Sequence, residues 1–445
     1  MRFLPHTADD IRAMLDVVGV AEIAELFADV PAELRARAAL NLPAGLGEHA
    51  VRAHMETLAG GNCGAQLLCF TGAGAYPHFI PAVVDQILQR AEFYSAYTPY
   101  QPEASQGTLQ AIFEFQTLVA MLLGMEVANA SMYDGASATA EAVLMALRLG
   151  RPRSRVVLSR ALHPQYREVV RTYASGAGDG ELVEAPFAAT GRTDAARLRQ
   201  LVDGRTAAVV VGYPNFFGVI EDVAGIAELA REQGALLVTA TTEPVALGLL
   251  QSPGALGADI AVAEGQSLGI PMSYGGPGVG LFATRTAHVR SMPGRLVGEA
   301  VDSAGRRGYV LTLATREQHI RREKATSNIC TNQGLMALAV TAYLSLVGKH
   351  GFRELAVVNA AAAHRAAARL TVLPRWRLRF AAPFFNEFVI TGSDAEAAWT
   401  AARQRGVFAG LPLQRWYPEL ADSLLLCATE LHDAPALDRL AEALA

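Results

Sequence analysis

Lysine is scarce in this chain of 445 residues: among its 38 basic residues, only Lys324 and Lys349 are lysines. Cysteine is scarce too. The four cysteines show no CxxC spacing and no nearby histidine pattern, so we expect no disulfide framework and no zinc or other metal site. The net charge of −5 brings no basic patch, which argues against nucleic acid as a partner. The N-terminus shows no secretory signal, and a reducing cytoplasm is the expected location.

One uncharged stretch, residues 329–348, is long enough to suggest a membrane span. Polar side chains interrupt it, among them Asn332, Gln333 and Thr341. We therefore expect a buried helix there and no membrane partner.

The chain divides into three predicted parts: a helical arm over 1–60, a large α/β domain over 61–330 and a smaller α+β domain over 331–445. In the arm, Thr7 and Asp10 have the spacing of a capping box, and apolar residues follow at helical intervals. Such an arm either wraps a partner subunit or forms a plain surface hairpin of helices, and the sequence leaves both open.

Short apolar runs alternate with helical patterns between residues 155 and 285. The expected strands are 155–159, 208–211, 236–240, 259–263 and 279–284, with an amphipathic helix over 222–233. This alternation predicts a mostly parallel sheet that is covered on both faces. In the C-terminal part we expect helices over 333–347 and 352–370, strands near 377–380, 386–390 and 424–428, and helices after Asp394 and at the end of the chain.

The turn after the 259–263 strand lies where a doubly wound sheet usually presents its chemistry. In many enzymes of one such fold, a lysine in this turn forms a Schiff base with pyridoxal phosphate. Here Gln266 and Ser267 occupy the turn and neither has an amine, although Ser267 stands near the lysine position. Residues 240–244 also lack the usual aspartate partner of the cofactor ring nitrogen, because Glu243 is offset from the strand end.

A loop rich in tyrosine, proline and uncharged polar residues spans residues 94–107. It suits a rigid polar lining for a small ligand. The alternative is a well-packed connection whose tyrosines cover the edge of the core. The candidate lining residues are Tyr97, Tyr100, Gln101, Ser105 and Gln106.

Small residues at 129–141 begin a predicted helix, where free backbone N–H groups can meet a phosphate. Asp134 and Ser137 also make ordinary helix caps. His163 follows a strand and either stacks on a cofactor ring or makes a structural hydrogen bond.

A further polar loop contains Thr326, Ser327 and Asn328. In a dimer of this architecture, these side chains can reach the neighbour's phosphate. The alternative is an interdomain linker that Ser327 and Asn328 cap.

Five motifs together resemble the glycine cleavage system P-protein, and more narrowly the first (α) subunit of its split bacterial form. They are YTPYQPEASQG at 97–107, NASMYDGA at 129–136, PNFFGVIED at 214–222, GQSLG at 265–269 and SNI at 327–329. The likeness spans nearly the whole chain in the right order.

The resemblance implies a pyridoxal-phosphate-dependent transferase of fold type I, with a mostly parallel seven-stranded sheet in the large domain. It implies a subunit of glycine decarboxylase that has no active site of its own. A homologous second subunit would carry the lysine and the pyridoxal phosphate in an αβ dimer, expected to assemble as α2β2. The complex would decarboxylate glycine and pass the aminomethyl group to the lipoyl arm of H-protein, while Thr326, Ser327 and Asn328 contact the partner's phosphate.

Two alternatives remain at this stage. The first is a self-sufficient homodimeric pyridoxal-phosphate decarboxylase or aminotransferase. It needs Lys324 or Lys349 to reach the cofactor, and the positions of both lysines in the chain argue against this. The second is a non-enzymatic scaffold or regulatory paralogue.

Overall fold

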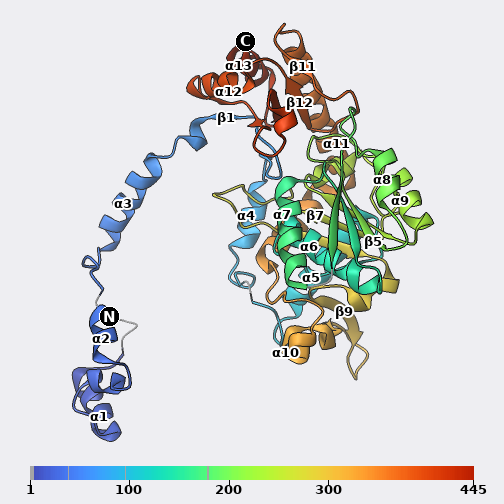
Figure 1. Cartoon of the computed structure of the whole chain (residues 1–445). Helices are drawn as coiled ribbons and strands as arrows, with labels where there is room; N and C mark the ends of the chain where they lie inside the picture. Colours follow the sequence, from blue (N-terminus) through green and yellow to red (C-terminus); the bar gives the residue numbers. More distant parts are fainter. Residues whose placement is uncertain (1–4, 39, 96, 178–179) are drawn as a thin grey trace. The chain divides into compact units, whose positions relative to one another are not determined.

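The computed structural model describes residues 5–38, 40–95, 97–177 and 180–445. The chain has two compact units, residues 1–65 and 66–445 (Figure 1). The predicted division of the second unit at residue 330 stays a prediction.

The N-terminal unit is helical, as predicted. It contains α1 (Ala8–Val18), the 3₁₀ turn η1 (Ile23–Phe27), α2 (Ala32–Arg37) and α3 (Glu48–Gly60). The predicted capping box is present, because the Asp10 N–H donates to the Thr7 hydroxyl at 3.2 Å and the Thr7 N–H donates to the Asp10 carboxylate at 2.7 Å.

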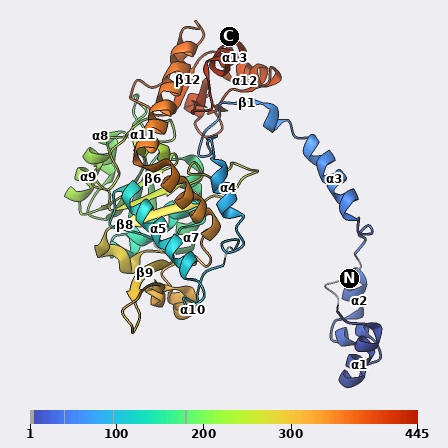
Figure 2. The same cartoon turned by 180° about the vertical axis from the view of Figure 1, so that it is seen from behind.

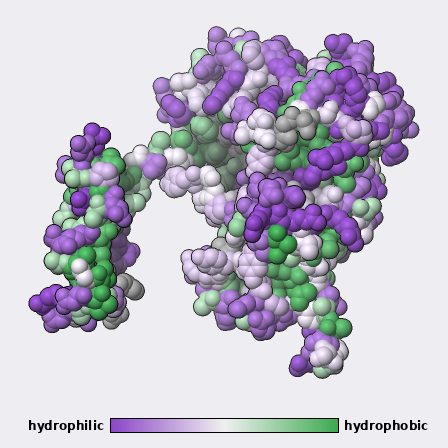
Figure 3. All heavy atoms as spheres, turned by 60° about the horizontal axis from the view of Figure 1, so that its bottom comes forward, coloured by the Kyte–Doolittle hydropathy of each residue, from purple (hydrophilic) through white to green (hydrophobic). Residues whose placement is uncertain are grey.

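Within its described residues, this unit has one buried side chain, Leu15. Ile11 and Val20 are half-buried and its large exposed apolar side chains are numerous; Figure 3 shows apolar residues gathered along one face of this segment. The large exposed ones are Met14, Val17, Val18, Ile23, Leu26, Phe27, Val30, Leu34, Leu40, Leu42, Leu46, Val51, Met55 and Leu58. A unit with so small a core leaves its apolar surface available to another chain.

A seven-stranded sheet forms the centre of the second unit, in the order β2-β8-β7-β6-β5-β3-β4. Strands β3 to β7 are parallel, whereas β8 runs antiparallel to β7 and β2. The bounds are β2 (Val127–Ala128), β3 (Arg155–Ser159), β4 (Glu181–Ala185), β5 (Thr206–Gly212), β6 (Leu236–Thr241), β7 (Ile260–Glu264) and β8 (Gly280–Thr284). The mostly parallel sheet and its five predicted strands are confirmed.

Both faces of this sheet are buried. Alternate residues of each strand point to opposite sides, and helices cover both sides. On β5, Val209 and Val211 pack with α8 (Ala195–Leu201) and α9 (Val223–Glu232). Their neighbour Val210 packs on the other side with α6 and α7. The helices that cover this other side are α6 (Gly135–Leu149) and α7 (Pro164–Ala177). Figures 1 and 2 show the sheet between these two sets of helices.

A smaller antiparallel sheet has the order β11-β12-β15-β14. Its strands are β11 (Arg377–Leu378), β12 (Glu387–Thr391), β14 (Leu411–Pro412) and β15 (Ser423–Cys427), and the helices near it are α12 (Ala395–Gln404) and α13 (Ala434–Leu444). The short strand β1 (Leu68–Cys69) pairs with β13 (Val407–Phe408) beside this sheet. The predicted α+β character of this region is therefore present.

The long helix α11 (Gly334–Thr371) contacts α5 (Gln106–Leu123) and α4 (Ala82–Leu88), and also β12 and α13. Gly348 breaks it with φ 60° and ψ 177°, between the two helices that the sequence predicts. By length and composition alone, α11 is a candidate membrane span. Its Tyr343 and Phe352 pack in the core instead, which agrees with the buried helix expected there.

The hairpin β9 (Leu296–Val301) and β10 (Arg307–Thr312), followed by α10 (Gln318–Arg321), was not predicted. It lies against α5, which brings the polar loop before α5 close to the segment that follows the hairpin.

Candidate functional site

The carboxyl ends of β3, β5, β6 and β7 meet at one edge of the sheet, because these strands are parallel. The segments that follow them carry the residues singled out from the sequence. His163 follows β3, Glu243 follows β6, and Ser267 follows β7. This edge is where a doubly wound sheet normally binds its ligand.

Ser267 lies in the turn after β7 and is only 1% exposed. Its hydroxyl has no hydrogen-bond partner among the described residues. The neighbouring Gln266 is fully engaged: its side-chain oxygen accepts from the Tyr76 N–H at 2.8 Å, and its amide donates to the Ile270 carbonyl at 2.7 Å. The turn therefore offers no amine to a cofactor, and its polar groups are turned to the protein interior.

Helix α6 begins at the same edge with the predicted cap. The Ser137 N–H donates to the Asp134 carboxylate at 2.7 Å, and the Asp134 N–H donates back to the Ser137 hydroxyl at 3.2 Å. Asp134 and Ser137 therefore make an ordinary helix cap, which was the alternative to phosphate binding at this helix start.

A second carboxylate, Glu264 at the end of β7, also lies at the start of α6. It accepts the Gly135 N–H at 2.8 Å and the N–H groups of Gln266 and Val279, both at 3.1 Å. Burial raises the pKa of Glu264 to about 7, although these three hydrogen bonds oppose the shift. The side chain of Glu264 therefore already occupies the Gly135 N–H at the start of α6.

Glu243 is buried and belongs to a network of charged side chains. Its carboxylate lies 2.9 Å from the Nε2 atom of His78, whose Nδ1 atom lies 2.9 Å from Glu430. Burial lowers the pKa of His78, but the two carboxylates outweigh it and raise the pKa to about 10. His78 is therefore an imidazolium that donates to both, and Asn386 and Asn359 donate further hydrogen bonds to the two carboxylates.

Glu387 on β12 forms a third buried acidic site. It accepts the Ala73 N–H at 2.6 Å and the Tyr76 hydroxyl at 2.8 Å. The Tyr76 hydroxyl also lies 3.2 Å from Thr242, the residue that follows β6. Burial raises the pKa of Glu387 to about 8, so this carboxyl group is largely protonated at neutral pH.

His163 makes a structural hydrogen bond, which favours the second of its two interpretations. Its Nε2 atom lies 2.9 Å from the Ala73 carbonyl, and its Nδ1 atom accepts from the Gln165 N–H at 3.2 Å. Burial lowers its pKa to about 4, so the ring is neutral and Nε2–H is the donor. Gly74 covers the ring closely, since an added Cβ there would lie 3.0 Å from Nε2.

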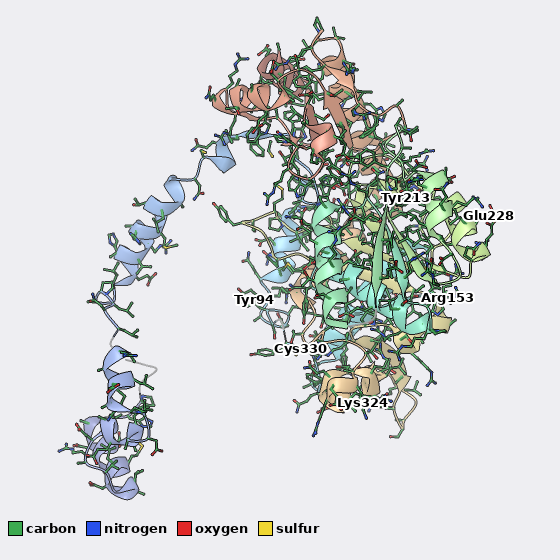
Figure 4. All side chains as sticks on the ribbon, viewed as in Figure 1. Tyr94, Arg153, Tyr213, Glu228, Lys324 and Cys330 are labelled. Atoms are coloured by element: carbon green, nitrogen blue, oxygen red, sulfur yellow. The ribbon has the colours of Figure 1, made fainter. Side chains whose placement is uncertain are left out.

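Tyr100 and Asn328 line one cavity of about 510 Å³. The buried Arg295 and Glu317, with Nε and Oε2 3.1 Å apart, form its charged wall, and Arg295 also donates to the Tyr100 hydroxyl. The loops 97–107 and 326–328, which were predicted separately from the sequence, therefore meet at one cavity. It lies beside Cys330, which Figure 4 labels near α10.

The other members of these loops are placed as follows. Tyr97 is 87% exposed, Gln101 and Gln106 are exposed, and Ser105, Thr326 and Ser327 are half-buried. The Gln106 amide exchanges two hydrogen bonds with the Tyr309 backbone, at 2.9 and 2.8 Å, and so holds α5 against β10. Their roles toward a ligand stay predictions.

Both lysines are exposed. Lys324 lies near α10, away from Tyr213, which marks the carboxyl end of β5 (Figure 4). In the described part of the chain, no group of three or more His, Cys, Asp or Glu side chains is placed to hold a metal ion.

A doubly wound sheet, an α6 N-terminus at its carboxyl edge and a second small sheet define a protein of the pyridoxal-phosphate fold type I class. The sphingosine-1-phosphate lyase of Burkholderia pseudomallei K96243 shares this fold, with a TM-score of 0.68 at 18% identity and 92% of each chain covered. The chain belongs to the glycine cleavage system P-protein family, whose model matches residues 1–444.

Two relatives are much more similar. A probable glycine dehydrogenase (decarboxylating) subunit 1 of Anaeromyxobacter dehalogenans (strain 2CP-C) is 57% identical, with 97% of each chain covered. The crystal structure of glycine decarboxylase (P-protein) of the glycine cleavage system, in inhibitor-bound form, matches with a TM-score of 0.92 at 46% identity, covering 100% of this chain and 99% of that one.

Proposed function

We propose that this chain is the first subunit of a glycine decarboxylase, and that a homologous second subunit holds the pyridoxal phosphate. The observation that carries the proposal is the buried Ser267 in the turn after β7, in a chain that matches a relative named subunit 1 over almost its whole length. The residues present here do not fit the cofactor: the turn has no amine, and the Gly135 N–H at the start of α6 is already bonded to Glu264.

In the complex, pyridoxal phosphate supplies the electron sink for the loss of the glycine carboxyl group. This chain contributes positioning. We propose that the cavity shared by Tyr100 and Asn328 faces the partner's site, where Thr326, Ser327 and Asn328 donate hydrogen bonds to the phosphate. The loop with Tyr97, Gln101, Ser105 and Gln106 forms part of the wall, and lipoylated H-protein receives the aminomethyl group.

The N-terminal unit supports an obligate partner. Its described residues bury Leu15 alone, while most of its large apolar side chains are exposed. We propose that the partner subunit covers this surface in an αβ dimer that pairs to α2β2, which light scattering of the purified mixture measures directly.

The decisive experiment measures glycine-dependent exchange of labelled carbon dioxide in the presence of lipoylated H-protein. This chain alone, the lysine-bearing subunit alone and their mixture are compared at equal concentrations. We expect activity only in the mixture. Full turnover by this chain alone, or a borohydride-trapped pyridoxyl group on Lys324 or Lys349, would refute the proposal.

The role of the 326–328 loop is tested separately. Asn328→Ala in this chain removes one hydrogen bond to an ionised phosphate, which is worth about 1.5–3 kcal/mol. The complex should then bind pyridoxal phosphate roughly tenfold or more weakly. Gln200→Ala, an exposed change on α8, is the control and should leave cofactor affinity unchanged. Equal cofactor affinity in both variants would show that Asn328 does not hydrogen-bond to the phosphate.

A further inference from the structure

The start of α6 has the construction of an anion site. Three backbone N–H groups donate to the Glu264 carboxylate: that of Gly135 at the helix start to Oε2, and those of Gln266 in the turn after β7 and Val279 just before β8 to Oε1. They come from three separate segments of the chain, of which the first is far in sequence from the other two. Helix N-termini with free N–H groups are general binding places for phosphate, because the donors and the helix dipole both favour an anion.

The space around this point is shaped by glycines. An added Cβ at Gly278 would lie 3.2 and 3.3 Å from the two Glu264 oxygens, and one at Gly135 would lie 3.0 Å from the Glu264 Cβ. The Gly135 Cβ would also lie 2.3 Å from the Tyr166 hydroxyl. Side chains are thus kept out of a small cradle, and the Glu264 carboxylate is the group that fills it.

We propose that Glu264 occupies a phosphate site at the start of α6, so that this site excludes phosphate independently of the missing lysine. The carboxylate satisfies the three donors that a phosphate would use. Asp134, the cap of the same helix, places a second carboxylate beside it. A phosphate at this point would have to displace the hydrogen-bonded Glu264 carboxyl group and approach the Asp134 carboxylate, which is unfavourable in a buried site.

This inference goes beyond the proposed function and does not rest on it, since it concerns only what this chain binds by itself. If the chain proved to be a scaffold instead of an enzyme subunit, the occupied site would remain. If Glu264 proved not to block phosphate, the partner subunit could still hold the cofactor.

The test uses the full chain and inorganic phosphate, with chloride at equal ionic strength as the reference. Glu264→Ala empties the cradle, whereas Glu264→Gln keeps its volume and one oxygen acceptor. Glu221→Ala is the matched control, because Glu221 is also a buried carboxylate that accepts a backbone N–H, that of Thr193, but its hydrogen-bond partners are Thr193 and Asn215, neither of which is on α6. Binding is followed by phosphorus NMR line broadening and by the melting temperature.

We expect the wild-type, Glu264→Gln and Glu221→Ala chains to show no saturable phosphate binding up to tens of millimolar. Glu264→Ala should bind phosphate at least tenfold more tightly than these three and melt several degrees higher in phosphate than in chloride. A folded Glu264→Ala chain without this gain would overturn the proposal.

Two further measurements keep the test decisive if Glu264→Ala does not fold. Glu264→Ser leaves one acceptor for the freed N–H groups and should show the same gain in phosphate affinity. Wild-type crystals soaked in phosphate should retain Glu264 on the Gly135 N–H. A phosphate found there, with the Glu264 side chain displaced, contradicts the proposal.

Discussion

Replacing His78 tests the buried ion network at the edge of the sheet. His78 and Glu243 have side-chain exposures of 2% each, and Glu430 holds the other nitrogen of the ring. Because His78→Ala leaves Glu243 buried without its cationic partner, it should lower the free energy of unfolding by about 3–5 kcal/mol. Arg199→Ala is the control: its pair with Glu232 is exposed, so the change should cost about 0–1 kcal/mol.

The pH dependence gives a second and more specific signature. Although burial lowers the pKa of His78, the charges and hydrogen bonds of Glu243 and Glu430 raise it from 6.5 to about 10. Since the folded pKa exceeds the unfolded one, the folded state binds the proton more tightly. The stabilisation is therefore fully present below pH 6.5 and is lost as the pH rises toward 10. At about 1.4 kcal/mol per pH unit, this difference in pKa corresponds to roughly 5 kcal/mol.

The assay is urea unfolding, followed by circular dichroism, of wild-type and His78→Gln chains at intervals from pH 6 to pH 10. Glutamine keeps hydrogen bonds to the carboxylates but has no charge to lose. The nearby Glu387 titrates within part of this range, but it does so in both chains and largely cancels in their difference. The stability difference should shrink by several kcal/mol between pH 6.5 and 10. A difference that stays constant over this range would refute the assignment of an imidazolium.

Three further outcomes are expected. In the same urea assay, the free energy of unfolding of Glu387→Gln should rise by a few kcal/mol relative to wild type between pH 4.5 and 8. Burial raises the folded pKa of Glu387 from 4.5 to about 8, so the wild-type chain loses stability as the pH rises through this range. Parallel pH curves would contradict this. Gly218→Ala should have a much lower melting temperature than Gly45→Ala. Gly218 has φ 77°, and an added Cβ there would lie 2.0 Å from the Glu387 carbonyl oxygen, whereas nothing lies within 4 Å at Gly45. Equal melting temperatures would count against the close approach. Deleting residues 1–60 should abolish co-purification with the partner subunit, while the circular dichroism spectrum shows that the remaining chain stays folded. A stoichiometric complex of the truncated chain with the partner would show that the exposed apolar surface of the N-terminal unit is not the contact.

Much of the fold could be predicted because its central strands are continuous apolar runs. Thr206–Gly212 is buried along its whole length, so its pattern is unambiguous. The strand Glu181–Ala185 was missed because Glu181 and Glu184 interrupt its apolar run at the sheet edge. The hairpin β9–β10 was missed because many of its side chains are exposed or half-buried, so no strong alternation marks it.

The candidate site could be predicted only in part. The turn with Ser267 follows a predictable strand, so its missing amine is visible in the sequence. His78 lies 165 positions from Glu243 and 352 from Glu430, and Tyr76 lies 311 from Glu387. No local pattern links residues so far apart, and each of these side chains alone has an ordinary structural explanation. Their grouping follows from the topology, which brings the N-terminal end of the second unit against the small sheet.

The buried acids share one physical role at this edge. Each strand end and turn leaves backbone N–H groups that need acceptors when water is excluded. Glu243 accepts from Val245, Glu264 from Gly135, and Glu387 from Ala73. An open ligand site would leave such donors to the ligand, whereas here the chain satisfies them itself.

Restoring the amine alone should therefore not restore the cofactor. A Ser267→Lys chain should remain without stoichiometric pyridoxal phosphate after dialysis, because Glu264 still holds the Gly135 N–H and a lysine at this buried position has no room prepared for it. Ser267→Lys combined with Glu264→Ala should retain more cofactor, measured by absorbance and by peptide mapping after borohydride reduction. Full cofactor retention by the Ser267→Lys chain would show that the lysine was the one missing component and that the internal carboxylate is no obstacle.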